Sequence, residues 1–291
     1  MAGLIRAGIG GWTFEPWRGV FYPKGLKHAA ELAYASRQVT AIEINSTYYS
    51  MQKPQSWAKW RDETPEGFVF TIKGSRFCTN RRVLADAGEG MARFLDQGLV
   101  ELGDRLGPIL WQFMPTKKFD PDDFAAFLAL LPASHGGLVL RHAVEVRHES
   151  FAVPEFVALC RKHGVAVCIS ENVAYPMVPD ITAGFVYARL LGGADDIPTG
   201  YPPDGLDQWA QRFAAYAAGG LPGDLPALDP AHPAPKQDRD VFAFFIHEGK
   251  VRAPAAAQAL LDRLYPDRPR PAVVKPAAKP RRPPPKRKPK A

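Results

Sequence analysis

Eight short apolar runs are spread along this chain of 291 residues, and each ends abruptly in polar or charged residues. Each run is long enough for a strand and too short for a helix of ordinary length. Most are followed by a segment whose apolar residues recur with helical periodicity, so strands and helices alternate. This alternation predicts an α/β fold, a single-domain (β/α)₈ TIM-type barrel with parallel strands. The predicted strands are 5–11, 41–45, 68–73, 109–113, 143–147, 165–170, 185–190 and 241–246.

Prolines and apolar spacing predict the helices between these strands. A proline suits the first helical turn, where its missing N–H costs no hydrogen bond. Residues 172–183 show no convincing helix. Residues 219–240 are dense in Gly and Pro, so we expect a mobile extended loop near the rim or an unstructured excursion. The predicted helices are 27–37, 54–61, 90–102, 120–130, 154–164, 206–218 and 254–264.

The positive charge of the chain is concentrated at its C-terminal end. The formal net charge is +7, but residues 268–291 hold ten Lys or Arg and no Asp or Glu. The remainder has 27 basic and 30 acidic residues, a net charge of about −3. Pro, Ala, Lys and Arg dominate this segment, so we expect a disordered basic tail. Such a tail would attract nucleic acid with little sequence preference, although a merely solubilising terminus explains the composition equally well.

Composition and motifs also bear on the compartment and on the classes of reaction. Three cysteines in no metal-ligand spacing favour a reducing compartment, and we expect a cytoplasmic protein. The sequence has no charged leader before an apolar stretch and no apolar run of membrane-spanning length, so no membrane partner is expected. It also lacks a nucleophile elbow and a P-loop, which disfavours serine hydrolases and NTP hydrolysis.

Two carboxylates stand near the ends of predicted strands, where barrel enzymes carry their active sites. Glu43 and Glu145 belong to the second and fifth runs and would face each other across the mouth. Paired carboxylates can act as general acid and base or bind a divalent cation. The alternative is a purely structural pair of ion pairs, with Lys73 and Arg147 as the partners.

Three cations at strand ends point to an anionic ligand. Lys73, Arg147 and Arg189 could gather around a phosphate or carboxylate. His148 and His247, with Glu171 and the two carboxylates above, could instead ligate a divalent metal, although no ligand-spacing signature supports this cofactor. We expect solvent-facing side chains for both histidines, and surface positions for the remaining five: His28, His135, His142, His163 and His232.

Aromatic residues gather in the first two predicted strand-to-helix loops. Rings in such loops can stack on a sugar or a nucleobase, but a large barrel also needs rings to pack beneath its loops. The sequence leaves both explanations open, except that Trp57 and Trp60 at helical spacing indicate packing against the barrel. The loop aromatics are Trp12, Trp17, Phe21, Tyr22, Tyr48 and Tyr49.

Several motifs, taken in their order along the chain, resemble one known family. The segments GIGGWTFEPWRGVFYPKGL, AIEINSTYYSMQKPQSWAKW, LGPILWQFMP and AVEVRHESF are similar to the domain-of-unknown-function 72 (YecE-like) family, over roughly residues 4–265. The resemblance implies a TIM-type barrel and brings no established reaction. We therefore expect one barrel domain over residues 1–267, and the composition sets the tail 268–291 apart from it. The matching positions are Gly11, Trp12, Trp17, Tyr22, Pro23, Glu43, Asn45, Tyr48 or Tyr49, Lys73, Gln112, Glu145, Arg147 and Arg189.

These residues lead to two functional hypotheses. The first is an enzyme that binds a small anionic or sugar-phosphate-like substrate at the barrel mouth, with Glu43 and Glu145 as catalytic groups. Its chemistry would be of the hydrolase or isomerase acid–base kind. The second is nucleic-acid binding or processing helped by residues 268–291, by fold analogy with endonuclease IV. The substrate-binding residues expected in the first case are Trp12, Asn45, Tyr48, Lys73, Gln112, Arg147, Arg189 and His247.

Overall fold

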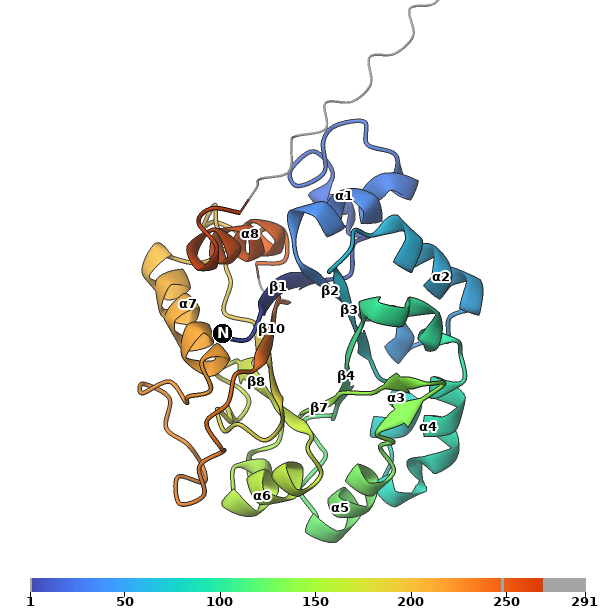
Figure 1. Ribbon diagram of the computed structural model, residues 1–291, viewed down its shortest axis with the longest axis vertical. Helices are drawn as coiled ribbons and strands as arrows, with labels where there is room; N and C mark the ends of the chain where they lie inside the picture. Colours follow the sequence, from blue (N-terminus) through green and yellow to red (C-terminus); the bar gives the residue numbers. More distant parts are fainter. Residues whose placement is uncertain (1, 247–248, 269–291) are drawn as a thin grey trace, which may run out of the picture.

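Eight parallel strands close into a barrel in the computed structural model, which describes residues 2–246 and 249–268. Figure 1 looks down this barrel and shows the helices in a ring around it. The closed order is β1-β10-β9-β8-β7-β4-β3-β2, so the predicted TIM-type barrel is confirmed. The strands are β1 (Ile5–Gly10), β2 (Ala41–Ile44), β3 (Val69–Lys73), β4 (Leu106–Gln112), β7 (His142–Glu145), β8 (Ala166–Glu171), β9 (Phe185–Leu190) and β10 (Asp240–Phe245).

The helical layer follows the predicted starts closely. Pro54, Pro121 and Pro154 each stand in the first turn of their helix, as expected from the missing N–H. Residues 172–183 contain no helix, as predicted. The α-helices are α1 (Glu31–Gln38), α2 (Pro54–Glu63), α3 (Arg76–Thr79), α4 (Gly88–Leu95), α5 (Pro121–Ala129), α6 (Pro154–Lys162), α7 (Pro203–Ala217) and α8 (Ala253–Leu264). The short helical turns are η1 (Glu15–Trp17), η2 (His28–Ala30), η3 (Ser46–Tyr48), η4 (Leu84–Ala87), η5 (Leu99–Arg105) and η6 (Glu149–Phe151).

Two predictions about the connections were wrong. The helix expected over 90–102 ends at Leu95, because Gly98 adopts a left-handed φ of 95° before η5 begins. The loop 219–240 runs from the end of α7 to the start of β10, so it lies at the N-terminal end of the barrel and not near the mouth. The Arg239 guanidinium fixes it by donating to the carbonyls of Pro235, Gln237 and Gly219. A small hairpin of β5 (Ser134–His135) and β6 (Leu138–Val139) was not predicted.

The two faces of the barrel wall are both apolar but belong to separate clusters. Inside, side chains such as Leu110, Phe185 and Phe244 pack against one another; outside, residues such as Ile42 and Trp111 pack against the helices. Successive strand residues point to opposite faces, so a residue two places beyond an inner one is also inner. Polar side chains that continue the inner set therefore end up above this apolar plug, at the C-terminal mouth.

The described residues also show the state of the three cysteines and the apolar character of the helices. Cys78, Cys160 and Cys168 are buried and free. Over residues 2–246 and 249–268, no helix combines the length and the apolar character that crossing a membrane requires.

Candidate active site at the barrel mouth

Arg189 joins the two predicted carboxylates at the top of the barrel interior. Its Nη1 donates to Glu145 Oε2 at 2.6 Å and its Nη2 donates to Glu43 Oε1 at 3.1 Å. All three side chains are buried. Burial alone would lower the pKa of Arg189, but the two carboxylates hold that pKa above its ordinary value. The sequence placed these residues at one opening, and the structure brings them into direct contact.

Glu145 is saturated with hydrogen-bond donors. Its Oε2 accepts from Gln112 Nε2 at 2.8 Å as well as from Arg189, and its Oε1 accepts from Arg147 Nε at 2.8 Å. The Arg147 Nη2 lies 2.8 Å from the same oxygen. Burial alone would raise the pKa of Glu145, but Arg189, Arg147 and Gln112 outweigh burial and lower the pKa to about 2. Glu145 therefore stays ionised at neutral pH.

Glu43 ends a second chain of hydrogen bonds across the interior. Its Oε2 accepts from the Tyr187 hydroxyl at 2.7 Å, and that hydroxyl lies 3.0 Å from Thr71 Oγ1. Burial, reinforced by Glu43, raises the pKa of Tyr187 well above its ordinary value, so the phenol remains a donor. The sequence analysis missed Tyr187. Its place two residues before Arg189 on one strand was the available signal, because strand side chains alternate between faces.

Lys73 lies beside this network but outside its ion pairs. It is 9% exposed, and within the described residues no carboxylate oxygen lies within 4.0 Å of its Nζ. The ammonium stands over the Tyr48 ring, 4.4 Å from its centroid. Burial, followed by the nearby Arg189 charge, lowers the pKa of Lys73 to about 8, although Glu43 and Glu145 oppose the shift. The amine is therefore mostly protonated at pH 7 but loses its proton about one pH unit higher.

Three further hydrogen-bond donors at the mouth have no acceptor among the described residues. Arg147 uses Nε and Nη2 on Glu145, so its Nη1 remains, and its guanidinium stacks on Tyr175 at 4.8 Å. Ser170 Oγ and Arg189 Nε are buried and have no hydrogen-bond partner among the described residues. Unpaired buried donors are rare and call for a water molecule or a ligand group as acceptor.

A cavity of about 290 Å³ opens at the β1, β2 and β10 side of the mouth. Asn45 lines it, and so does Lys250, a cation that the sequence analysis did not single out. Lys250 lies between the eighth strand of the barrel and α8, and anionic groups often bind there in TIM barrels. The position of a cation shortly after the last strand was the sequence signal for this residue. The lining residues are Gly10, Trp17, Asn45, Phe245, Ile246, Lys250 and Ala253.

Other predicted residues serve the fold. The Trp12 ring packs edge-on against Trp60 at 5.1 Å, and Trp17 and Trp57 are fully buried, which supports the packing explanation for these rings. His142 was expected on the surface, and this was wrong. It is buried between the Trp111 indole N–H, 3.1 Å from Nδ1, and the Pro132 carbonyl, 2.9 Å from Nε2.

The proposed metal ligands that the structure describes do not come together. His148 Nδ1 accepts from Ser150 N at 3.1 Å and so caps η6. Glu171 faces the helical layer, where it accepts from Tyr201, Trp209 and the Gly192 amide. No group of three or more His, Cys, Asp or Glu side chains in the described part of the chain is arranged to hold a metal. His247 and the tail beyond Arg268, which carry one predicted site residue and the predicted nucleic-acid contact, lie outside the described residues.

Comparison with known proteins identifies relatives without a stated activity. The family model described as "Protein of unknown function DUF72" matches residues 6–283. The UPF0759 protein YecE of Escherichia coli (strain K12) is 26% identical over 148 residues, which cover 51% of this chain and 50% of that protein. UPF0759 protein YunF of Bacillus subtilis (strain 168) is 26% identical over 159 residues, covering 53% and 54%. The chain thus spans about half the length of the curated relatives it matches.

Solved structures show the same fold. A DUF72 family protein from Thermotoga maritima MSB8 superposes with a TM-score of 0.64 at 22% identity, covering 88% of this chain and 96% of the other. A DUF72 family protein from Enterococcus faecalis V583 gives a TM-score of 0.66 at 16% identity, covering 90% and 95%. At these identities the likeness concerns the fold alone.

Proposed function

The chain belongs to the DUF72 family, whose members are described as proteins of unknown function, and we propose that it is an enzyme acting on a small anionic substrate at the barrel mouth. The observation that carries this proposal is Lys73, a buried amine that has no carboxylate partner in the described structure, beside carboxylates that already have other partners. An unpaired buried ammonium costs stability, so a functional reason for keeping it is needed.

Lys73 is the group best suited to take part in proton transfer. A general base works best when its pKa lies near the operating pH, and the pKa of Lys73 is lowered to about 8. Glu145, by contrast, has a pKa of about 2 and four donors on its oxygens. We assign Glu145 and Glu43 the task of holding Arg189 and Arg147 in place and setting the charge around Lys73, in acid–base chemistry of the isomerase or hydrolase kind.

The anionic part of the substrate would bind to donors that the network leaves unused. Arg189 gives both Nη atoms to carboxylates, which leaves only its buried Nε as a donor. Arg147 offers Nη1 at the mouth, and Lys250 and Asn45 offer cationic and amide donors in the adjoining cavity. Phosphate and carboxylate groups match such donors, and a sugar phosphate supplies both the anion and the hydroxyls that Asn45 could bind.

A thermal-shift screen with inorganic phosphate and a panel of sugar phosphates tests the binding step. We expect the best ligand to raise the Tm of the full chain and of the charge-matched control Lys162→Gln, whose lysine is exposed at the end of α6. Arg147→Gln should lose most of the shift, because it removes the donor facing the ligand. An equal Tm shift in Arg147→Gln would mean that the anion does not bind at this mouth.

Turnover of the ligand found in that screen tests the role of Lys73. Lys73→Met should lower kcat by roughly 10²- to 10⁴-fold, the usual contribution of a positioned acid or base, while ligand binding persists. The wild-type rate should rise with pH through about 8 as the amine loses its proton, and this limb should disappear in the variant. Unchanged kcat in a folded Lys73→Met protein would remove Lys73 from the chemistry.

A further inference from the structure

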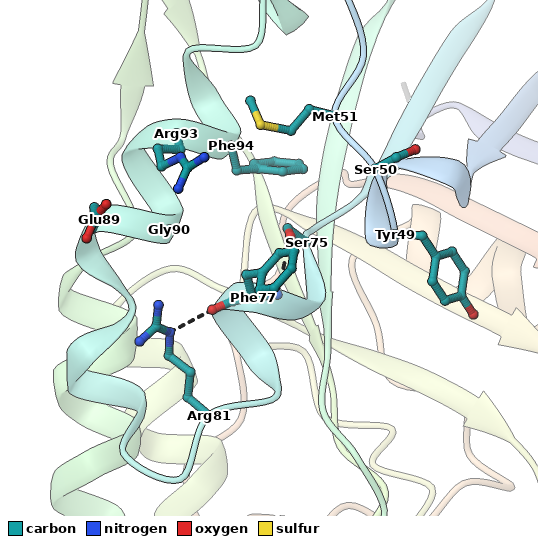
Figure 2. Close-up of a pocket in the computed structure, with 10 residues that line it drawn as sticks. All are labelled: Tyr49, Ser50, Met51, Ser75, Phe77, Arg81, Glu89, Gly90, Arg93 and Phe94. Carbon is teal, nitrogen blue, oxygen red and sulfur yellow. Dashed lines mark hydrogen bonds between the residues drawn. The ribbon is translucent and has the colours of Figure 1, made fainter.

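A second pocket lies beside the mouth, where the loop after β3 meets α4. Figure 2 shows its walls, in which the aromatic rings of Phe77 and Phe94 and the guanidinium groups of Arg81 and Arg93 stand around the hollow. Its volume is about 270 Å³, below the usual range for drug-sized ligands but enough for a single flat ring. The proposed function makes no use of this pocket.

Large apolar side chains are exposed around the pocket. Tyr49 is 64% exposed, Phe77 63% and Met51 52%, although aromatic residues elsewhere on the molecule pack into the core. The Tyr49 ring is held edge-on against Tyr48, with the centroids 5.0 Å apart. Neighbouring exposed apolar side chains that are fixed in place mark binding surfaces more often than scattered single ones do.

Arginines around the same pocket are free of ion pairs. Within the described residues, no carboxylate lies within 4.0 Å of the guanidinium groups of Arg76, Arg81 or Arg93, whereas Arg161, Arg189 and Arg212 are all paired. Arg76 stands 5.8 Å from the centroid of the Tyr49 ring and 5.5 Å from that of Phe77. Arg81 Nε donates to the Phe77 carbonyl at 2.6 Å. Glu89 is the one acid among the pocket's lining residues, so cations outnumber acids here.

We propose that this surface binds single-stranded nucleic acid, with one base in the pocket against Phe77 and the backbone phosphates on Arg76, Arg81 and Arg93. Exposed rings interleaved with arginines suit this ligand, because every base has a face for stacking and every nucleotide has a phosphate. Arg76 stands over the Tyr49 and Phe77 rings, whereas Arg81 and Arg93 line the pocket itself, so the three cations are spread over more surface than the pocket alone. An acidic peptide would satisfy the arginines but not the exposed rings.

This proposal does not depend on the enzyme hypothesis or on the tail. The pocket residues belong to the loops after β2 and β3 and to α4, whereas the basic residues of 268–291 lie elsewhere in the sequence. Since the tail attracts polyanions by charge alone, the experiment must separate it from the pocket. Keeping the tail in every variant makes its contribution constant.

Fluorescence anisotropy with a labelled oligothymidylate and the full chain tests the site. Phe77→Ala should weaken binding roughly tenfold, the scale of one stacked base. Arg76→Gln and Arg93→Gln should each reduce the slope of log Kd against log salt by about 0.7, the value for one phosphate contact on a single strand. The matched controls Lys162→Gln and Leu221→Ala, at exposed positions far from the pocket, should leave affinity and slope unchanged.

The outcomes that overturn the proposal are specific. Equal affinity in Phe77→Ala and the controls would show that the tail or another surface binds the oligonucleotide. Weaker binding in the arginine variants alone, or equally strong competition by polyphosphate or polyglutamate, would show an anion site without base recognition. Ultraviolet crosslinking followed by peptide mass spectrometry gives an independent measurement: crosslinks to the peptides with Tyr49 or Phe77 support the site, and crosslinks confined to 268–291 reject it.

Discussion

At the scale of single residues, the barrel mouth contains charged side chains that form ion pairs and one, Lys73, that forms none within the described residues. The sequence identified Glu43, Glu145, Lys73 and Arg189 but paired the carboxylates with Lys73 and Arg147 in its structural alternative. In the structure Arg147 does pair with Glu145, but Arg189 bridges both carboxylates and Lys73 has no ion pair within the described residues. Such ion pairs depend on the conformation of each side chain and on the distance between strands across the barrel. The spacing of residues along the chain determines neither. The consequence is a lysine that costs folding free energy.

Lys73→Met should therefore stabilise the protein at pH 7. The pKa of Lys73 is lowered from 10.5 to about 8, which corresponds to about 3 kcal/mol of lost stability while the lysine is charged in both states. Between pH 8 and 10.5 the folded state releases its proton before the unfolded state does, so the wild type gains stability as pH rises. The advantage of Lys73→Met in urea unfolding should shrink over this range. Lys162→Met is the control, and an advantage that is constant with pH would contradict the cause.

At the scale of elements, strand alternation explains how much of the site was predictable. All eight strands were found to within a few residues, and inner positions such as Glu145 and Arg189 met as expected. Glu171 stands one residue beyond the inner Ser170 and so points to the helices, where it binds Trp209. The position of the Gly- and Pro-rich loop 219–240 between a helix and the next strand was enough to place it at the N-terminal end, but its contacts with Asp180 and Arg161 could not be predicted, because distant segments make them.

Gly74→Ala should disturb the end of β3, the strand that presents Lys73. A Cβ at Gly74 would overlap the Trp111 ring, which is itself packed between Phe94 and Phe127 and cannot move freely. We expect a loss of about 1–3 kcal/mol in the free energy of unfolding, the usual range for overpacking a core. Gly184→Ala is the matched control, since a Cβ there meets no atom within 4 Å. Equal urea midpoints for the two variants would mean that the Trp111 side chain adapts at little cost.

At the scale of the whole molecule, the two ends of the barrel have different chemistry. The C-terminal end carries Lys73, Arg147 and the cavity with Lys250, all with donors that have no hydrogen-bond acceptor among the described residues. At the N-terminal end, Asp180 accepts from the Leu228 and Asp229 amides at 2.8 and 3.0 Å, and Arg161 donates to Asp229 at 2.7 Å. In TIM barrels the first end carries function and the second carries stability.

Asp180→Asn should separate these two properties. The amide cannot accept with both of its ends, so one backbone N–H loses its partner, and we expect a loss of about 1–3 kcal/mol in the free energy of unfolding. Asp207→Asn, which breaks an exposed ion pair with Arg263, should change stability far less. Both variants should bind the ligand at the mouth and the oligonucleotide with wild-type affinity. These affinities are measured at a temperature well below the Tm. A lower ligand affinity at the mouth in Asp180→Asn alone would contradict this separation. It would mean that a change at the N-terminal end reaches the mouth through the strands, because none of the contacts described at the mouth involves Asp180.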